Sequence, residues 1–340
     1  MTSRRRVASS HASVVSGHAG EPSDCADAAP GRMCPADYRY DPSVFDRPCE
    51  IRGDVLYVIG GSYGNTAALD LAARMRDSEH GDVTMIFNGD FHWFDAEPAW
   101  FAEVDNRVAG PGAVAMRGNV ETEISRLDDI GAGCGCAYPE TVSDHMVVRS
   151  NEMLRDLRAT ADELAARPRL AALPMHLMAE VGGLRIAVVH GDAAALAGWR
   201  FAPDALDDPA NRPWLAEVQA RSRVDIFAST HTCLAALRNF DLPAGTLTVI
   251  NNGAAGMPNF AGTRFGLISR IATRPARHVP LYGTVRDGVF IDALPVLYDD
   301  AAFLGRFLAR WPARSSAHTS YFGRIMNGPD HAVATARPRG

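Results

Sequence analysis

The sequence has no apolar run of the roughly 20 residues that a membrane-spanning helix requires. Its first residues, MTSRRRVASSHASVVSGHAGEPSD, contain a basic cluster, but the continuous apolar segment of a secretory signal does not follow it. We therefore expect no membrane association and a cytoplasmic location.

Cysteine is scarce, because the 340-residue chain contains only six. In a long chain without a signal peptide, so few cysteines are more often free thiols than a disulfide framework. The six are Cys25, Cys34, Cys49, Cys134, Cys136 and Cys233.

Positive charge is not in excess, since 34 Lys and Arg stand against 40 Asp and Glu, which gives a net charge of -6. Without a cationic field to attract a polyanion, we expect no nucleic-acid partner. The glycine turn in LYVIGGSYGNTAALDLA lacks the G-x-G-x-x-G spacing of dinucleotide-binding folds, and no G-x-x-x-x-G-K-[ST] loop occurs. The sequence thus argues against nicotinamide and nucleotide-kinase chemistry.

What the chain does contain is material for one large core, since 47% of its residues are hydrophobic. We predict a flexible N-terminal extension at residues 1–50, one domain at 51–312 and a C-terminal tail at 313–340. Within the extension, the arm PADYRYDPSVF is expected to lie on the domain. The tail has loop composition, apart from SYFGRI, which we expect to dock as a last turn.

Short apolar runs alternate with stretches of helical periodicity along the domain. The predicted strands are 54–59, 83–87, 113–116, 184–189, 224–228, 246–250, 265–271 and 287–292, and the predicted helices are 66–76, 96–105, 150–166 and 300–311. Apolar runs of this length between loops are typical of strands that are buried on both faces. The pattern therefore predicts a layered α/β fold.

Polar residues follow several of the predicted strands directly. The strand ends read Asn88-Gly89-Asp90, Arg117-Gly118-Asn119-Val120-Glu121, His190-Gly191-Asp192, Thr230-His231-Thr232-Cys233 and Asn251-Asn252-Gly253. In layered α/β folds, such residues converge on one rim, where ligands bind. A carboxylate, an amide oxygen and two imidazoles form a mixed oxygen and nitrogen shell that suits divalent Zn, Mn or Fe.

The order of these motifs over residues 54–272 resembles that of the calcineurin-like metallophosphoesterase family. Members of that family fold as a β-sandwich with helices on both outer faces. Two metals share the carboxylate of a Gly-Asp motif, and a bridging water or hydroxide attacks phosphorus. The resemblance implies that Asp90 is the shared ligand and that Asn119, His190 and His231 complete one metal site.

The other metal site of the family is degenerate in this chain. Gly61 stands where the family has an Asp ligand, Tyr63 where it has His, and Cys233 where it has the last His. Val120 also replaces the family's protonating His. Of the ligands of this site, only Asp90 and the thiol of Cys233 remain.

Two functions are compatible with a chain that has one complete set of metal ligands and has lost most of the other. In the first, which we favour, the protein hydrolyses a small phosphate mono- or diester with one metal-activated water, and Asp90, Asn119 and His231 are catalytic. In the second, the chain is a metal-binding or anion-binding regulatory domain. There, the GGSYGN turn presents backbone N–H groups to an anion.

Further residues are candidates for substrate binding or for a second metal. Arg117, Asn119 and Asn252 lie on the expected rim and are candidate phosphate contacts. Cys134, Cys136 and Cys233 either rebuild a second site from thiolates or are structural, with a redox pair as a third alternative.

Three neighbours of the expected ligands have alternative roles. His92 either faces the rim as a proton donor or ligand, or lies exposed on a loop. Glu121 either orients a ligand or caps the helix that follows it. Asp192 is a candidate hydrogen-bond partner for the imidazole of His190.

Overall fold

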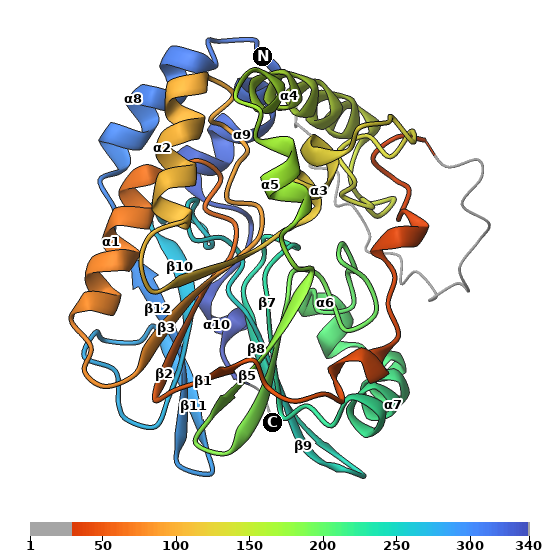
Figure 1. The fold of residues 1–340 in the computed structure, drawn as a ribbon, viewed down its shortest axis with the longest axis vertical. Helices are drawn as coiled ribbons and strands as arrows, with labels where there is room; N and C mark the ends of the chain where they lie inside the picture. Colours follow the sequence, from red (N-terminus) through yellow and green to blue (C-terminus); the bar gives the residue numbers. More distant parts are fainter. Residues whose placement is uncertain (1–28, 339–340) are drawn as a thin grey trace, which may run out of the picture.

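The computed structural model describes residues 29–338, which form two facing six-stranded sheets (Figure 1). One sheet contains, in spatial order, β1 (Ile51–Arg52), β5 (His176–Val181), β6 (Leu184–Val189), β7 (Ile226–Ser229), β9 (Gly245–Asn251) and β8 (Ala236–Leu242). The other contains β11 (Tyr282–Arg286), β12 (Val289–Val296), β10 (Gly266–Ala272), β2 (Val55–Ile59), β3 (Val83–Asn88) and β4 (Ala113–Met116). The predicted layered α/β sandwich is confirmed.

Helices cover both outer faces of the sandwich and the end at which the parallel strands finish (Figure 1). They are α1 (Thr66–Asp77), α2 (Pro98–Val108), α3 (Asn119–Ser125), α4 (Asp144–Glu163), α5 (Arg167–Ala171), α6 (Pro203–Asp207), α7 (Arg212–Ser222), α8 (Asp300–Arg310), α9 (Ser316–Asn327) and α10 (Val333–Ala336). Short 3-10 turns occur at Ala36–Tyr38, Pro42–Phe45 and Pro209–Asn211. Side-chain caps begin several helices; Asn65, for example, accepts from the backbone N–H of Ala68 at the start of α1.

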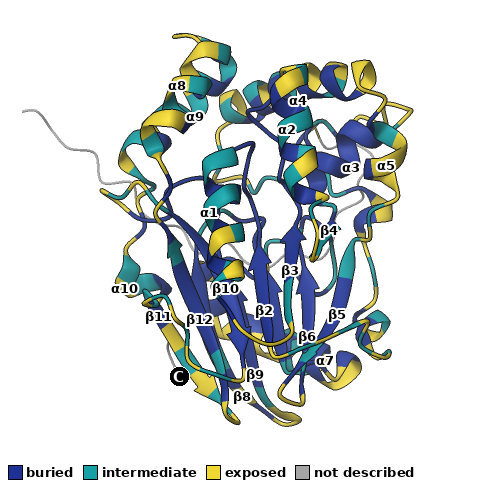
Figure 2. Cartoon of the chain, turned by 60° about the vertical axis from the view of Figure 1, so that its left-hand side comes forward, coloured by how far each residue is buried: buried dark blue, intermediate teal, exposed yellow. Residues whose placement is uncertain are grey.

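The core between the sheets is built from the inward-facing residues of both, such as Leu56 and Val58 of β2 and Ile186 and Val188 of β6. The opposite faces of the central strands pack against helices, so these strands are buried on both sides, as Figure 2 shows by the dark blue colour of β2, β3 and β10. This double burial explains why the sequence of these strands is apolar throughout rather than alternating.

Parallel pairing brings the chemistry to one edge. In one sheet, β2, β3 and β4 are parallel, and in the other, β6, β7 and β9 are parallel. The carboxyl ends of all six strands therefore finish at the same end of the sandwich, the upper end in Figure 1.

The arm of the N-terminal extension packs on the domain, as the sequence predicts. Tyr38 and Phe45 are fully buried, and the Tyr40 hydroxyl donates to the carbonyl oxygen of Asp192 at 2.7 Å. The expectation of a flexible segment falls largely on residues 1–28, which lie outside the described residues.

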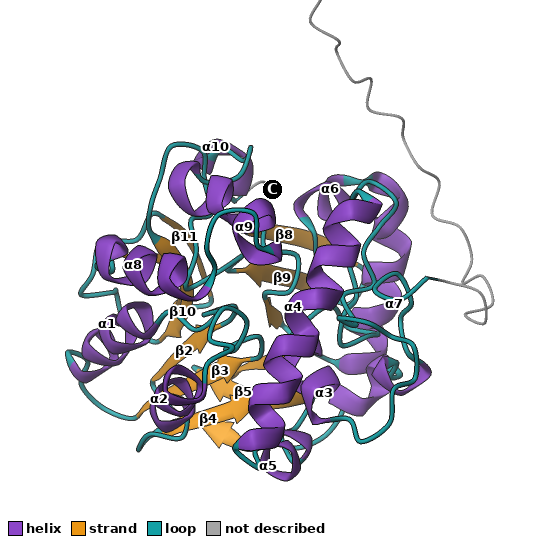
Figure 3. Ribbon diagram, turned by 90° about the horizontal axis from the view of Figure 1, so that it is seen from above, coloured by secondary structure: helices purple, strands orange, loops and turns teal. Residues whose placement is uncertain are grey.

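The tail predicted to have loop structure is instead helical. It contains α9 and α10, and α9 contacts α4 across the end of the sandwich (Figure 3). Only Ala317 and Ile325 of α9 are buried, so its apolar stripe is too short to be recognised without its packing partner. The elements β5, β8, β11 and α7 were not predicted from the sequence. None of the described helices is long and apolar enough to span a membrane.

Candidate metal centre

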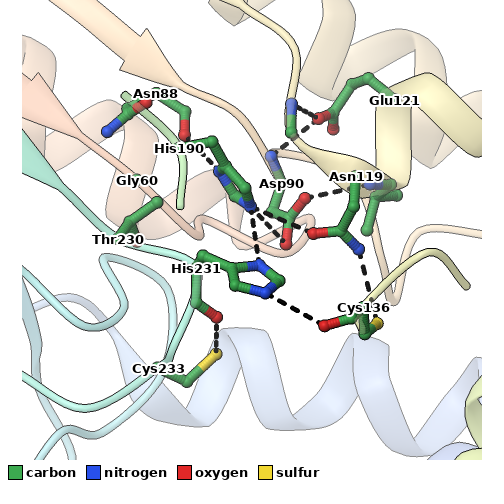
Figure 4. A network of polar contacts seen from close by, with 12 residues as sticks. Gly60, Asn88, Asp90, Asn119, Glu121, Cys136, His190, Thr230, His231 and Cys233 are labelled. Carbon is green, nitrogen blue, oxygen red and sulfur yellow. Dashed lines mark hydrogen bonds and ion pairs between the residues drawn. The ribbon is translucent and has the colours of Figure 1, made fainter. Parts of the chain in front are cut away.

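Asp90 follows β3 in a left-handed backbone conformation, with φ of 50°. The buried carboxylate of Glu121 holds this turn, because it accepts from the backbone N–H groups of Gly118 (2.8 Å), Asp90 (2.7 Å) and Phe91 (3.0 Å) (Figure 4). Glu121 therefore fixes the backbone that carries Asp90, which is the first of its two predicted roles. It also holds the first turn of the helix, so the two roles coincide.

Asn119 begins α3 and directs its side-chain oxygen toward Asp90 and His190 (Figure 4). Its Nδ2 donates to the carbonyl oxygen of Cys134 at 2.9 Å, which fixes the orientation of the amide. The preceding Gly118 allows the start of α3 to approach Asp90 closely, because a Cβ on residue 118 would lie 2.3 Å from Oδ1 of Asp90.

The two histidines are each oriented by one backbone carbonyl. Nδ1 of His190 lies 2.8 Å from the carbonyl oxygen of Asn88, and Nε2 of His231 lies 3.2 Å from that of Cys136. A carbonyl oxygen only accepts, so these ring nitrogens carry the protons. The lone pairs of the neutral rings are then on Nε2 of His190 and Nδ1 of His231.

These lone pairs point at the same place. Nε2 of His190 lies 3.2 Å from Nδ1 of His231, 3.1 Å from Oδ1 of Asn119 and 3.3 Å from Oδ2 of Asp90. Among the described residues, Asp90, His190 and His231 are the group of His, Cys, Asp and Glu whose ligand atoms lie within 4.8 Å of one another. The four predicted ligands are thus brought together.

The electrostatics of this cluster favour a positive charge between the side chains. Burial opposes protonation of His190, but the Asp90 carboxylate outweighs burial and raises its pKa. Burial and the neighbouring His190 lower the pKa of His231 to about 3, so His231 keeps its lone pair. The two ring nitrogens 3.2 Å apart, the Asp90 carboxylate and the Asn119 amide oxygen form a donor set that fits a divalent metal.

The three positions at which the resemblance implies a degenerate second site lie close together: Gly61, Tyr63 and Cys233. Gly61 has φ of 65°, and a Cβ on it would lie 2.8–2.9 Å from the ring and hydroxyl of Tyr63. The Tyr63 hydroxyl in turn lies 2.8 Å from Sγ of Cys233. A phenol and a thiol in contact therefore stand beside Asp90 where the resemblance would put a second metal site.

The cysteine pair contacts two candidate ligands through backbone carbonyls, and Sγ of Cys136 also accepts from Nδ2 of Asn119 at 3.4 Å. The carbonyls of Cys134 and Cys136 accept from Asn119 and His231, and that of Cys136 also accepts from the indole N–H of Trp199 at 3.0 Å. No three-ligand cluster includes a cysteine within residues 29–338. This geometry agrees with the structural alternative for Cys134 and Cys136 rather than with a second thiolate site.

The candidate metal centre lies at one side of a cavity of about 740 Å³. Asp90, Asn119, His231 and Cys233 line it, and so do side chains from α4, α6, α9 and the loop before α4. Apolar and aromatic side chains predominate in the wall: Trp93, Val120, Tyr138, Pro139, Val142, Met146, Trp199, Leu234, Met257 and Tyr321. Such a pocket excludes water from most of a bound organic group.

The two further substrate-binding candidates do not face this cavity. Nη1 of Arg117 donates to the carbonyl oxygen of Ala171 at 2.8 Å, and burial lowers the pKa of this arginine. Nδ2 of Asn252 donates to the carbonyl oxygens of Gly60 and Leu267, at 3.0 and 2.8 Å. Both side chains bond to backbone carbonyls of neighbouring segments, and neither lines the cavity.

Two other expectations are wrong. His92 is neither exposed nor on the rim: its ring nitrogens lie 2.6 Å from Asp95 and 3.0 Å from Asp105. Burial opposes its charge, but the carboxylates of Asp95 and Asp105 raise the pKa of His92 to about 9. Asp192 does not bond to His190 but accepts from backbone N–H groups of residues 194, 195 and 200, which closes the loop after β6.

No protein-family model and no curated protein matches the chain. Among solved structures, a hypothetical protein from Pyrococcus horikoshii OT3 is similar, with 16% identity, a TM-score of 0.55, and coverage of 82% of this chain and 100% of that one. The two chains share a fold. A metallophosphoesterase from Sphaerobacter thermophilus aligns with 16% identity and a TM-score of 0.46, over 82% of this chain and 100% of that one.

Proposed function

We propose that the protein hydrolyses phosphate mono- or diesters with a single divalent metal ion, Mn, Zn or Fe. The observation that carries this proposal is the convergence of Asp90, Asn119, His190 and His231, each held in place by a backbone hydrogen bond. When bound, a divalent ion supplies Lewis acidity, which lowers the pKa of water and stabilises negative charge on phosphoryl oxygens.

The protein's own residues prepare the site for that chemistry. Val120 donates its backbone N–H to Oδ1 of Asp90 at 3.1 Å, so Oδ2 is left free to bind the metal ion. Asn119 and His231 lie at the cavity wall, where they can contact both the metal ion and a substrate oxygen. The apolar wall keeps bulk water away from the reacting phosphoryl group.

The test is hydrolysis of an aryl phosphate monoester and diester by purified protein loaded with Mn or Zn. Turnover is expected in the wild type and is expected to fall to background in Asp90→Asn and His231→Ala. His145→Ala and Asp144→Asn, at exposed positions of α4, are matched controls that should keep full activity. Failure of the metal-loaded wild type on both esters would remove the hydrolase proposal.

A second candidate function follows from the contact between Tyr63 and Cys233, which occupies the degenerate site. A chain with one metal ion and no second one can bind an anion without hydrolysing it. Tight binding of inorganic phosphate to the metal-loaded protein, together with no turnover of either ester, would identify such a binding or regulatory domain.

A further inference from the structure

We propose that Arg324 of α9 supplies the second positive charge of the site and binds the phosphoryl group of the substrate. This inference rests on the proposed function, because it assigns a role toward the substrate that the metal centre would bind. It concerns a residue of the SYFGRI segment, which the sequence predicts only to dock as a last turn.

Arg324 lies in the same cavity as the metal ligands. It is a lining residue together with Asp90, Asn119 and His231, and it is the one Lys or Arg in the described part of the chain that lines this cavity. A phosphate group that reaches the metal centre through the cavity therefore meets this guanidinium and no other described cation of the wall.

Arg324 is anchored beside the degenerate metal site. Its Nη2 donates to the carbonyl oxygens of Cys233 at 2.6 Å and Pro258 at 3.3 Å. Cys233 is the residue whose thiol contacts Tyr63. A fixed cation therefore stands next to the place where the family resemblance puts the second metal.

The charge of Arg324 remains available to an anion. Its two hydrogen-bond acceptors are neutral carbonyl oxygens, which orient the guanidinium without cancelling its charge. Its Nε is buried and has no hydrogen-bond partner among residues 29–338, an arrangement that is costly unless an acceptor arrives. A planar guanidinium can donate two parallel hydrogen bonds to a phosphate. Arg324 can do so because its present acceptors are carbonyl oxygens and not a carboxylate.

Charge elsewhere in the cavity limits where the phosphoryl group binds. The carboxylate of Asp204 lines the wall on α6 and repels an anion, whereas that of Asp207 beside it is paired with Arg238. Most of the remaining wall is apolar. A substrate with one phosphoryl group, placed between the metal ligands and Arg324, satisfies this distribution better than a polyphosphate does.

The experiment compares Arg324→Met and Arg324→Lys with the wild type in the full-length, metal-loaded protein. Binding of inorganic phosphate by calorimetry and of the metal alone by titration are the two readouts, with ester turnover as a third. We expect Arg324→Met to weaken phosphate binding at least about 10-fold and to lower kcat/KM about 100-fold or more, with metal affinity unchanged. Arg324→Lys, which keeps the charge but loses the fork, should recover part of both losses.

Arg264→Met is the matched control. Arg264 also reaches the end of α9, through the carbonyl oxygen of Met326 at 3.4 Å, and pairs with Asp300, but it does not line the cavity. It should leave both affinities unchanged.

Two results would overturn the inference. One is unchanged phosphate affinity in Arg324→Met. The other is a fall in the metal affinity of Arg324→Met as large as the fall in its phosphate affinity, whether Arg324→Lys restores the metal affinity fully or loses it equally. That result would mean that Arg324 only supports the loop that carries His231. Neither result touches the proposed function, which fails separately if the wild type has no turnover.

Discussion

The hydroxyl of Tyr63 lies 2.8 Å from the sulfur of Cys233, although 170 positions separate these residues in the chain. The family resemblance assigns a metal ligand to each of the two positions. The two side chains contact each other directly, and the ring of Tyr63 leaves no room for a Cβ on Gly61.

The first prediction concerns metal content. Elemental analysis of protein purified with Mn or Zn should give one ion per chain, because the described chain contains one suitable cluster. The variants Cys134→Ser, Cys136→Ser and Cys233→Ser should keep that ratio. A ratio of two that falls in these variants would support the thiolate site instead.

The second prediction is that Gly61→Asp alone does not restore a second site. The left-handed backbone and the ring of Tyr63 both oppose a side chain here, so we expect a loss of roughly 1–3 kcal/mol in the free energy of unfolding. Denaturant unfolding measures it. Adding Tyr63→His and Cys233→His to this variant should relieve the clash and raise the metal content above one, and an unchanged content would contradict the assignment of these positions.

The third prediction tests Glu121 as the residue that positions Asp90. Glu121→Gln replaces an acceptor oxygen with an N–H₂ group that faces backbone donors, so metal affinity should fall about 10- to 100-fold. Metal titration of the apoprotein is the measurement. Glu123→Gln is a matched control on the same helix, since Glu123 is also buried but bonds to Tyr38 and Arg126 away from the metal centre. Equal losses in both variants would show that only α3 stability matters.

The fourth prediction concerns stability and pH. Glu79 and Arg270 form a buried ion pair at 2.6 Å. Burial opposes ionisation of Glu79, but Arg270 outweighs it and lowers the pKa of this carboxyl. Its contribution to stability is therefore present above the unfolded pKa, near 4.3, and is lost as the pH falls through the lower folded pKa.

Glu79→Gln should consequently lower the free energy of unfolding by up to about 3 kcal/mol at pH 7, because the buried Arg270 loses its closest carboxylate and keeps only Asp292 at 3.4 Å. The difference from the wild type should shrink below about pH 4. Glu103→Gln, in a half-exposed pair with Arg306, should cost far less. A pH-independent difference in the Glu79 variant would contradict this assignment.

Much of the fold could be predicted because its strands carry a local signal. The runs at 83–87, 113–116 and 184–189 were predicted within one residue of β3, β4 and β6, since each is apolar and bounded by turns. The strand β8 was missed because its sequence, ALRNFDL, includes the charged Arg238 and Asp241. Arg238 is buried only because Asp207 and the carbonyls near α10 receive its guanidinium, and these partners are distant in sequence.

The sequence by itself determined the residue types at the strand ends, and with them the four convergent ligands, because parallel strands deliver their carboxyl ends to one edge. Only the tertiary structure decided which way each side chain turns. It directed Arg117 and Asn252 into backbone contacts, buried His92 between two carboxylates, and brought Arg324 from the tail into the cavity. These outcomes depend on partners that lie far away along the chain, and packing free energy rather than local pattern selects them.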